Sequence, residues 1–134
     1  MSRYLSDVGV DTVIGKKIDR ALWTGRDIVL CLSDGTVSTL TPDGSCCSEC
    51  TIADVDGSDA LKGGTLLRVE DLELVKGGNL DDYEAVDVWG HRFVTDKGIC
   101  TIGMRLEHNG YYSGQLYVQQ TLEAPDAPEL EDFS

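Results

Sequence analysis

The sequence predicts a mainly β, or α+β, protein that forms a single compact domain of antiparallel hairpins with one or two short helices. Turn signals of the Asp-Gly, Gly-Gly and Asn-Gly type recur along the 134 residues, and the segments between them are short and rich in Val, Ile, Thr, Tyr and Leu. Asn-Gly and Asp-Gly supply the positive φ angles that tight hairpins require. The turn signals are Asp34-Gly35, Asp43-Gly44, Asp56-Gly57, Gly63-Gly64, Gly77-Gly78 and Asn109-Gly110.

Two hairpins are predicted from these turns. The first covers residues 27–41 and turns at Asp34-Gly35. The second joins residues 99–107 to residues 111–120 through Asn109-Gly110. Alternation of apolar and polar residues assigns one face of each strand to the core. The residues assigned to that face are Ile28, Leu30 and Leu32, then Cys100, Ile102, Met104 and Leu106, then Tyr112, Leu116 and Val118.

Two further strands are predicted over residues 65–75 and 83–95. In the first, the apolar residues change from odd to even positions, so we expect a bulge or bend near Glu70-Asp71. The second strand places Ala85, Trp89 and Phe93 on one face.

Helix is predicted at two places only. Ser6 is a candidate cap for a short helix that runs through Ile14 and ends at Gly15. Ser58 is a candidate cap for a single turn that Gly63 closes.

The chain is strongly acidic, with a formal net charge of −13. Its organisation is predicted as a globular domain over residues 1–122 and an acidic tail over residues 123–134, whose composition is typical of disorder in isolation. The acidic surface expected from this net charge repels nucleic acid phosphates and anionic lipid, so we expect neither nucleic acid nor membrane as a partner. The tail's acidic residues are Glu123, Asp126, Glu129, Glu131 and Asp132.

The chain shows no membrane-spanning apolar run and no signal-peptide pattern at its N-terminus. We therefore expect a cytoplasmic protein whose five cysteines are free thiols, because a reducing cytosol disfavours disulfides and five cannot all pair.

Three of the cysteines, Cys46, Cys47 and Cys50, lie within five positions. A structural zinc site needs four ligands, and no second Cys-x-x-Cys pair accompanies Cys47-x-x-Cys50. The residues that follow are β-branched and acidic, which disfavours the helix start of a redox motif. We therefore interpret these cysteines as core residues, with a reactive or ligand role kept as the alternative, and we expect no metal and no cofactor.

No catalytic residue is assigned, and we expect a protein that is not an enzyme. His91 and His108 stand near no recognisable nucleophile motif, although a pair such as Cys47 and His108 assembled in space stays open. The tyrosine-rich turn is a candidate contact surface, because tyrosine is enriched at interfaces, and simple cross-strand packing is the alternative. The candidate surface comprises His108, Asn109, Gly110, Tyr111, Tyr112 and Ser113.

Several short motifs resemble a family of small uncharacterised domains encoded mainly by tailed bacteriophages. The resemblance runs from about Lys16 to Val118, and its most specific pieces are Cys46-Cys47 with Glu49 and the Asn-Gly-Tyr-Tyr-Ser stretch at residues 109–113. The chain departs from the pattern at Ser45 and Ser48, which flank the cysteine pair where acidic residues are usual. The resemblance implies a phage as the owner of this chain and implies no mechanism.

These observations favour a non-enzymatic phage accessory protein that binds a host or viral protein in the cytoplasm of the infected cell. One alternative is a minor virion or decoration protein. A second alternative is a metal- or thiol-dependent enzyme that uses Cys46, Cys47 and His108.

Overall fold

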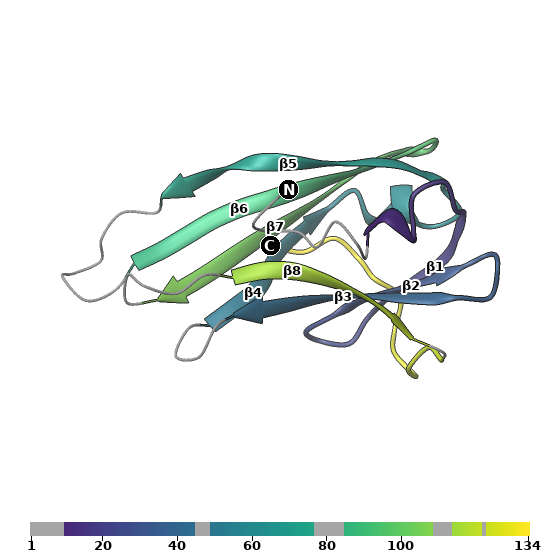
Figure 1. Ribbon diagram of the computed structural model, residues 1–134, viewed down its shortest axis with the longest axis horizontal. Coiled ribbons are helices and arrows are strands. Elements are labelled where there is room, and N and C mark those ends of the chain that lie inside the picture. The colour runs from purple at the N-terminus through teal and green to yellow at the C-terminus, as the bar shows by residue number, and fades with distance from the viewer. Residues whose placement is uncertain (1–9, 45–48, 77–84, 109–113, 122) are drawn as a thin grey trace.

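The chain folds into two layers of antiparallel strands (Figure 1). The computed structural model describes residues 10–44, 49–76, 85–108, 114–121 and 123–134. Within these ranges two four-stranded sheets form, with strand orders β1-β2-β3-β8 and β4-β7-β6-β5, which confirms the predicted fold class. The strands are β1 (Ile18–Trp23), β2 (Ile28–Leu32), β3 (Val37–Gly44), β4 (Glu49–Asp56), β5 (Leu66–Lys76), β6 (Ala85–Thr95), β7 (Gly98–His108) and β8 (Gly114–Thr121).

The hairpin predicted over residues 27–41 is confirmed as β2 and β3. At its turn the carboxylate of Asp34 accepts hydrogen bonds from the backbone N–H of Thr36 at 3.0 Å and from its hydroxyl at 2.6 Å. The Nζ of Lys16 lies 2.8 Å from Oδ2 of the same carboxylate. The Lys16 ammonium, followed by the two Thr36 hydrogen bonds, lowers the pKa of Asp34 below its ordinary value.

The hairpin predicted about Asn109-Gly110 is wrong, although both of its strands form. β7 pairs with β4 and β6 in one sheet, whereas β8 pairs with β3 in the other. Gly44 stands opposite Gly114 at the end of one ladder, and Glu49 stands opposite Glu107 in the other ladder. The chain therefore changes sheet between β3 and β4 and again between β7 and β8. Apolar alternation specifies the buried face of a strand but not its partner.

The irregularities in β5 do not lie at the predicted position. Glu70-Asp71 pairs regularly with β6, and the register shifts between Leu66 and Arg68 and again between Leu72 and Val75. Each shift inserts one extra residue into β5, which reverses the face that the following residues present. Between the two shifts, residues 68–72 pair with β6 without interruption, so Val69 and Leu72 stand on opposite faces and neither bulge produces the change of apolar phase.

β1 is a strand to which the sequence analysis assigned no element. A bulge between Ile18 and Arg20 interrupts its alternation, so the strand has no clear period of two. The turn to β2 is closed by Thr24, whose hydroxyl accepts the backbone N–H of Asp27 at 2.9 Å and that of Arg26 at 3.3 Å.

The short turn predicted before Gly63 forms as the 3₁₀ helix η1 (Ser58–Leu61). Ser58 is its first residue and not its cap, which corrects the prediction. The cap position is Gly57, at φ 90°, and a Cβ there would collide with the carbonyl of Ile99. Gly63, at φ 84°, follows the turn as expected.

Only the end of the predicted N-terminal helix lies in the described residues. The N–H groups of Val13 and Ile14 both donate to the carbonyl of Val10, and Gly15 follows at φ 88°. In the part of the chain that the structure describes, no helix is both long enough and apolar enough to cross a bilayer.

The main core lies between the two sheets. It contains the predicted core residues whose side chains the structure describes, namely Ile28, Leu30, Leu32, Trp89, Phe93, Cys100, Ile102, Met104, Leu106, Leu116 and Val118. Tyr112 and the side chain of Ala85 lie outside the described part of the chain. A second cluster, on the other face of the β1-β2-β3 layer, joins Leu22, Val29 and Val37 and is contacted by Ala127 of the C-terminal segment. Among the largest fully buried side chains of the main core are Ile28, Leu30, Leu40, Phe93, Ile102, Met104, Leu106 and Leu116.

Candidate functional site

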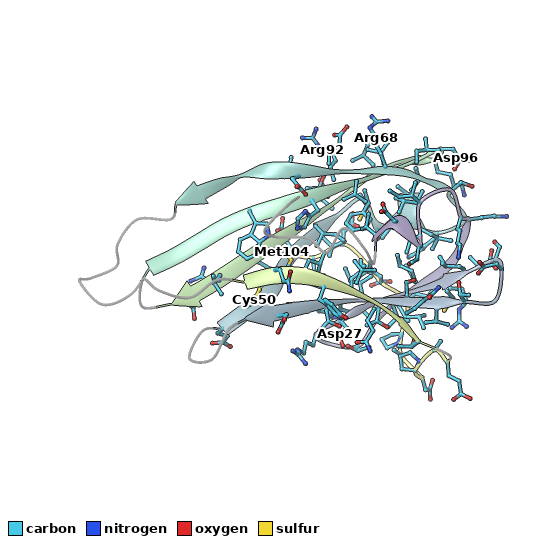
Figure 2. All side chains as sticks on the ribbon, in the orientation of Figure 1. Asp27, Cys50, Arg68, Arg92, Asp96 and Met104 are labelled. Atoms are coloured by element: carbon cyan, nitrogen blue, oxygen red, sulfur yellow. The ribbon has the colours of Figure 1, made fainter. Side chains whose placement is uncertain are left out.

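Of the three clustered cysteines, only Cys50 lies in the described residues. It stands on β4, is partly buried against the main core, and has its Sγ 3.9 Å from the carbonyl oxygen of Gln115 on β8 (Figure 2). Burial raises the pKa of Cys50 to about 11, so its thiol is protonated at neutral pH. A protonated thiol is a poor nucleophile and a poor metal ligand. Cys46 and Cys47 lie outside the described residues.

The other described cysteines are free and stand apart from Cys50. Cys100 is fully buried on β7, and its burial raises its pKa to about 12. Cys31 on β2 packs against the second apolar cluster. No three His, Cys, Asp or Glu side chains among the described residues are grouped so that they could hold a metal ion.

The tyrosine-rich turn, residues 109–113, also lies outside the described residues. His108 is the last residue of β7, where its backbone pairs with Ala85 of β6, and the structure describes nothing of its side chain. Tyr117 on β8 is 40% exposed.

His91 has an interior position that its sequence context did not reveal. It stands on β6 with 0% exposure, directly opposite Asp71 of β5. Its Nδ1 lies 3.0 Å from a carboxylate oxygen of Asp71. Because an ionised carboxylate only accepts, Nδ1 carries the proton in this contact, which orients the ring.

A groove of about 560 Å³ lies beside the C-terminal segment. One lining residue, Trp23, comes from the end of β1. The others come from the acidic segment that follows β8. The lining residues are Trp23, Pro128, Glu129, Glu131, Asp132 and Phe133.

Backbone hydrogen bonds to two sheet edges hold the C-terminal segment in place. The N–H of Trp23 donates to the carbonyl of Pro128 at 2.8 Å, and the N–H of Leu130 donates to the carbonyl of Ala21 at 2.8 Å. Further along, Phe133 and Val55 of β4 exchange two such bonds, at 2.8 and 3.0 Å. β1 and β4 are edge strands of different sheets, so the segment covers exposed edges of both layers (Figure 1).

Side chains add to this attachment. Leu130 is 0% exposed in the main core. The rings of Trp23 and Phe133 meet with their centroids 4.9 Å apart and their planes at 41°, and both rings stay partly exposed to the groove. Residues 123–134, predicted as an acidic tail of disordered composition, therefore include a stretch that packs into the fold.

The carboxylates of the groove are not equivalent. Asp132 accepts a 2.7 Å hydrogen bond from the backbone N–H of Ser58, and this bond is the main cause that lowers its pKa. Glu129 and Glu131 are exposed, and no described cation lies within ion-pair distance of either. The groove therefore contains two carboxylates that the described cations leave uncompensated.

Two arginines pair with a carboxylate that does not line the groove. The Nε of Arg68 lies 2.8 Å from Oε2 of Glu70, and the Nη1 of Arg92 lies 3.5 Å from Oε1 of the same carboxylate. Both arginines are on the outward side of the β5-β6 pair (Figure 2). Arg68 is the main cause that lowers the pKa of Glu70. Of the described cations, Lys62 acts on the groove at a distance, since its charge is the least of the causes that lower the pKa of Asp132.

The aromatic part of this groove is not visible in the local sequence pattern. Trp23 belongs to β1, whose bulge breaks the apolar alternation, and Phe133 lies in a segment whose composition is mainly acidic. The sequence feature that could have indicated that this segment packs against the fold is the presence of Leu130 and Phe133, two large apolar residues three positions apart in an acidic stretch.

The fold and the groove define a two-layered antiparallel β protein with an acidic, partly aromatic surface depression. Residues 11–118 match the model of a family described as a domain of unknown function (DUF7448), so the chain belongs to this family. Neither the comparison with curated proteins nor that with solved structures found a match. Five of the six groove residues follow residue 118, so the groove depends mainly on a segment outside the matched region.

Proposed function

We propose that the protein is a non-enzymatic, phage-encoded accessory protein that binds another protein in the cytoplasm of the infected cell. The observation that carries this proposal is the groove, where the rings of Trp23 and Phe133 stay partly exposed beside carboxylates. Aromatic residues are enriched in protein interfaces. A depression that presents them is suited to receive an anchoring side chain.

The charge of the chain supports a protein partner in preference to a nucleic acid. A net charge of −13 repels phosphates and attracts basic surfaces, which accelerates encounter with a basic partner. The phage assignment rests on the resemblance of the Cys46-Cys47 and Asn-Gly-Tyr-Tyr-Ser pieces to domains of tailed phages.

The proposal is tested by capturing partners from infected cells. The full chain carries an affinity tag at its N-terminus, because the C-terminal segment lines the groove. We expect a small set of proteins to be enriched over an untagged control. At least one of them, once purified, should bind the purified chain at a defined stoichiometry in analytical ultracentrifugation.

Two results would contradict this function. One is capture of no protein that binds again after purification. The other is recovery of the chain in stoichiometric amounts from purified particles by mass spectrometry, which would support the virion alternative.

A further inference from the structure

We infer that the groove binds an arginine side chain presented by an extended basic segment of a partner protein. This inference rests on the proposed function and specifies the chemistry of the partner. Three properties of the described residues carry it: the aromatic pair, the uncompensated carboxylates and the rigidity of the segment that presents them.

The aromatic pair offers a surface for a flat cation. Trp23 and Phe133 lie at 41° to each other, and both line the groove. A guanidinium group stacks on aromatic faces and is more weakly hydrated than an ammonium group, so it loses less hydration when it leaves water. Arginine therefore suits these rings better than lysine does.

The carboxylates supply the matching charge. Leu130 points into the core with 0% exposure, and its neighbours Glu129 and Glu131 are exposed on either side of it. This alternation is typical of an extended segment and places both carboxylates on the solvent side. The five N–H donors of a guanidinium can satisfy carboxylate oxygens while the ring faces accept the planar surface. Asp132 is already engaged with Ser58 and contributes charge only.

Contacts within the protein itself fix the position of the C-terminal segment that lines the groove. Backbone bonds tie the segment to Ala21, Trp23 and Val55, so the rings and the carboxylates need little reordering when a ligand arrives. Preorganisation of this kind reduces the entropic cost of binding. The volume of about 560 Å³ exceeds one side chain, which leaves room for the neighbouring residues of an extended segment.

The test uses a short Gly/Ser peptide that carries several arginines, titrated into the full chain and followed by the indole N–H signals in NMR. The chain has two tryptophans, so Trp89, which is 3% exposed, serves as an internal reference for Trp23. We expect a saturable shift at Trp23 and little at Trp89. The same peptide with lysine should bind more weakly. The peptide with citrulline, an uncharged isostere of arginine, should not bind.

Matched variants locate the binding charge. Glu129→Gln with Glu131→Gln removes two charges inside the groove, and Glu123→Gln with Asp126→Asn removes two exposed charges of the same segment outside it. The groove variant should weaken arginine-peptide binding roughly tenfold, since two partly exposed ion pairs are lost. The outside variant should change it less than about twofold at physiological salt, because screening limits distant charges.

A third variant, Phe133→Leu, keeps an apolar side chain and removes one aromatic face. It should weaken the arginine peptide several-fold while the backbone bonds to Val55 persist.

Three results would overturn the inference: equal binding of the citrulline peptide, equal losses in the two charge variants, or no shift at Trp23. If a captured partner binds the Glu129→Gln, Glu131→Gln variant as tightly as the unmodified chain, the inference fails and the proposed function stands. If arginine peptides bind the groove and no cellular partner is found, the proposed function fails instead.

Discussion

The carboxylate of Asp132 accepts a hydrogen bond of 2.7 Å from the backbone N–H of Ser58, a residue that stands 74 positions earlier in the chain. The bond joins the C-terminal segment to the first residue of η1. Together with the backbone bonds at Val55 and Leu130, it holds the acidic segment against both sheets. The segment is therefore expected to contribute to stability as well as to the groove.

Replacing Asp132 with Asn should destabilise the protein at neutral pH and have less effect in acid. The pKa of Asp132 is lowered from 3.8 in the folded state, so the stabilisation is fully present above the unfolded pKa. It is lost as the pH falls through the folded pKa. Urea unfolding should show a difference between the two proteins that is constant from about pH 7 to about pH 5 and shrinks below about pH 4.

Asp126→Asn is the control for this comparison, because Asp126 is an exposed carboxylate of the same segment. Its effect should be small at every pH. Asp34 and Glu70 also have lowered pKa values, so the absolute stability of all variants falls in acid, and only the difference between variants isolates Asp132. A difference that stays constant to about pH 2 would contradict the prediction.

Leu130→Ala should reveal that the acidic segment is part of the core. Leu130 is 0% exposed, and truncating a buried leucine typically costs about 2–5 kcal/mol. Leu67→Ala is the matched control, because Leu67 is 50% exposed and its loss should cost less than about 1 kcal/mol. Chemical unfolding of both variants measures the contrast. Equal, small losses would mean that the segment does not pack in solution as the structure shows.

Gly103→Ala should destabilise the β4-β7 pair. A Cβ at Gly103 would collide with the carboxylate of Asp54, which is the far end of a partly buried side chain and can turn aside, so the loss should be less than about 1 kcal/mol. Asp54→Ala alone should change stability little, since Asp54 is only partly buried. The double variant should be more stable than the sum of the two changes predicts, and thermal or urea unfolding of the complete cycle measures this coupling. Additive losses would show that the collision is not the cause.

Cys50 and Cys100 should resist alkylation in the native protein. Their pKa values are raised to about 11 and about 12 by burial. At pH 8 the thiolate fraction of Cys50 is on the order of a hundredfold below that of an ordinary cysteine. Peptide fragmentation after iodoacetamide treatment should find both residues unmodified, and both modified after treatment in urea. The rate at Cys50 should rise about tenfold per pH unit up to about pH 11 while the fold persists. Rapid labelling of Cys50 at neutral pH would refute its placement against the core.

Much of the local structure can be predicted from the sequence. The strands β2, β5, β6, β7 and β8 lie where alternation places them, and faces such as Cys100, Ile102 and Met104 are buried as expected. β1 could not be predicted in this way, because its bulge between Ile18 and Arg20 breaks the period of two. The positions of the bulges in β5 could not be predicted either, because they depend on how β5 pairs with β6.

The candidate site could be predicted only in part. The acidity of the C-terminal segment is visible in its composition, but its attachment is not, since it depends on Leu130, Phe133 and the free edges of β1 and β4. The pair of Trp23 and Phe133 joins residues at opposite ends of the chain. The roles predicted for Cys46, Cys47 and residues 109–113 stay predictions, because these residues lie outside the described structure.

The sequence by itself determined the fold class, the net charge and the buried face of most strands, because each of these follows from composition or from side-chain alternation within a few residues. Only the tertiary structure decided which strands pair, where the chain changes sheet, and that the acidic segment closes two edges and forms a groove with Trp23. Those features depend on the burial of side chains and backbone groups that are distant in sequence, and a local pattern contains no information about such partners.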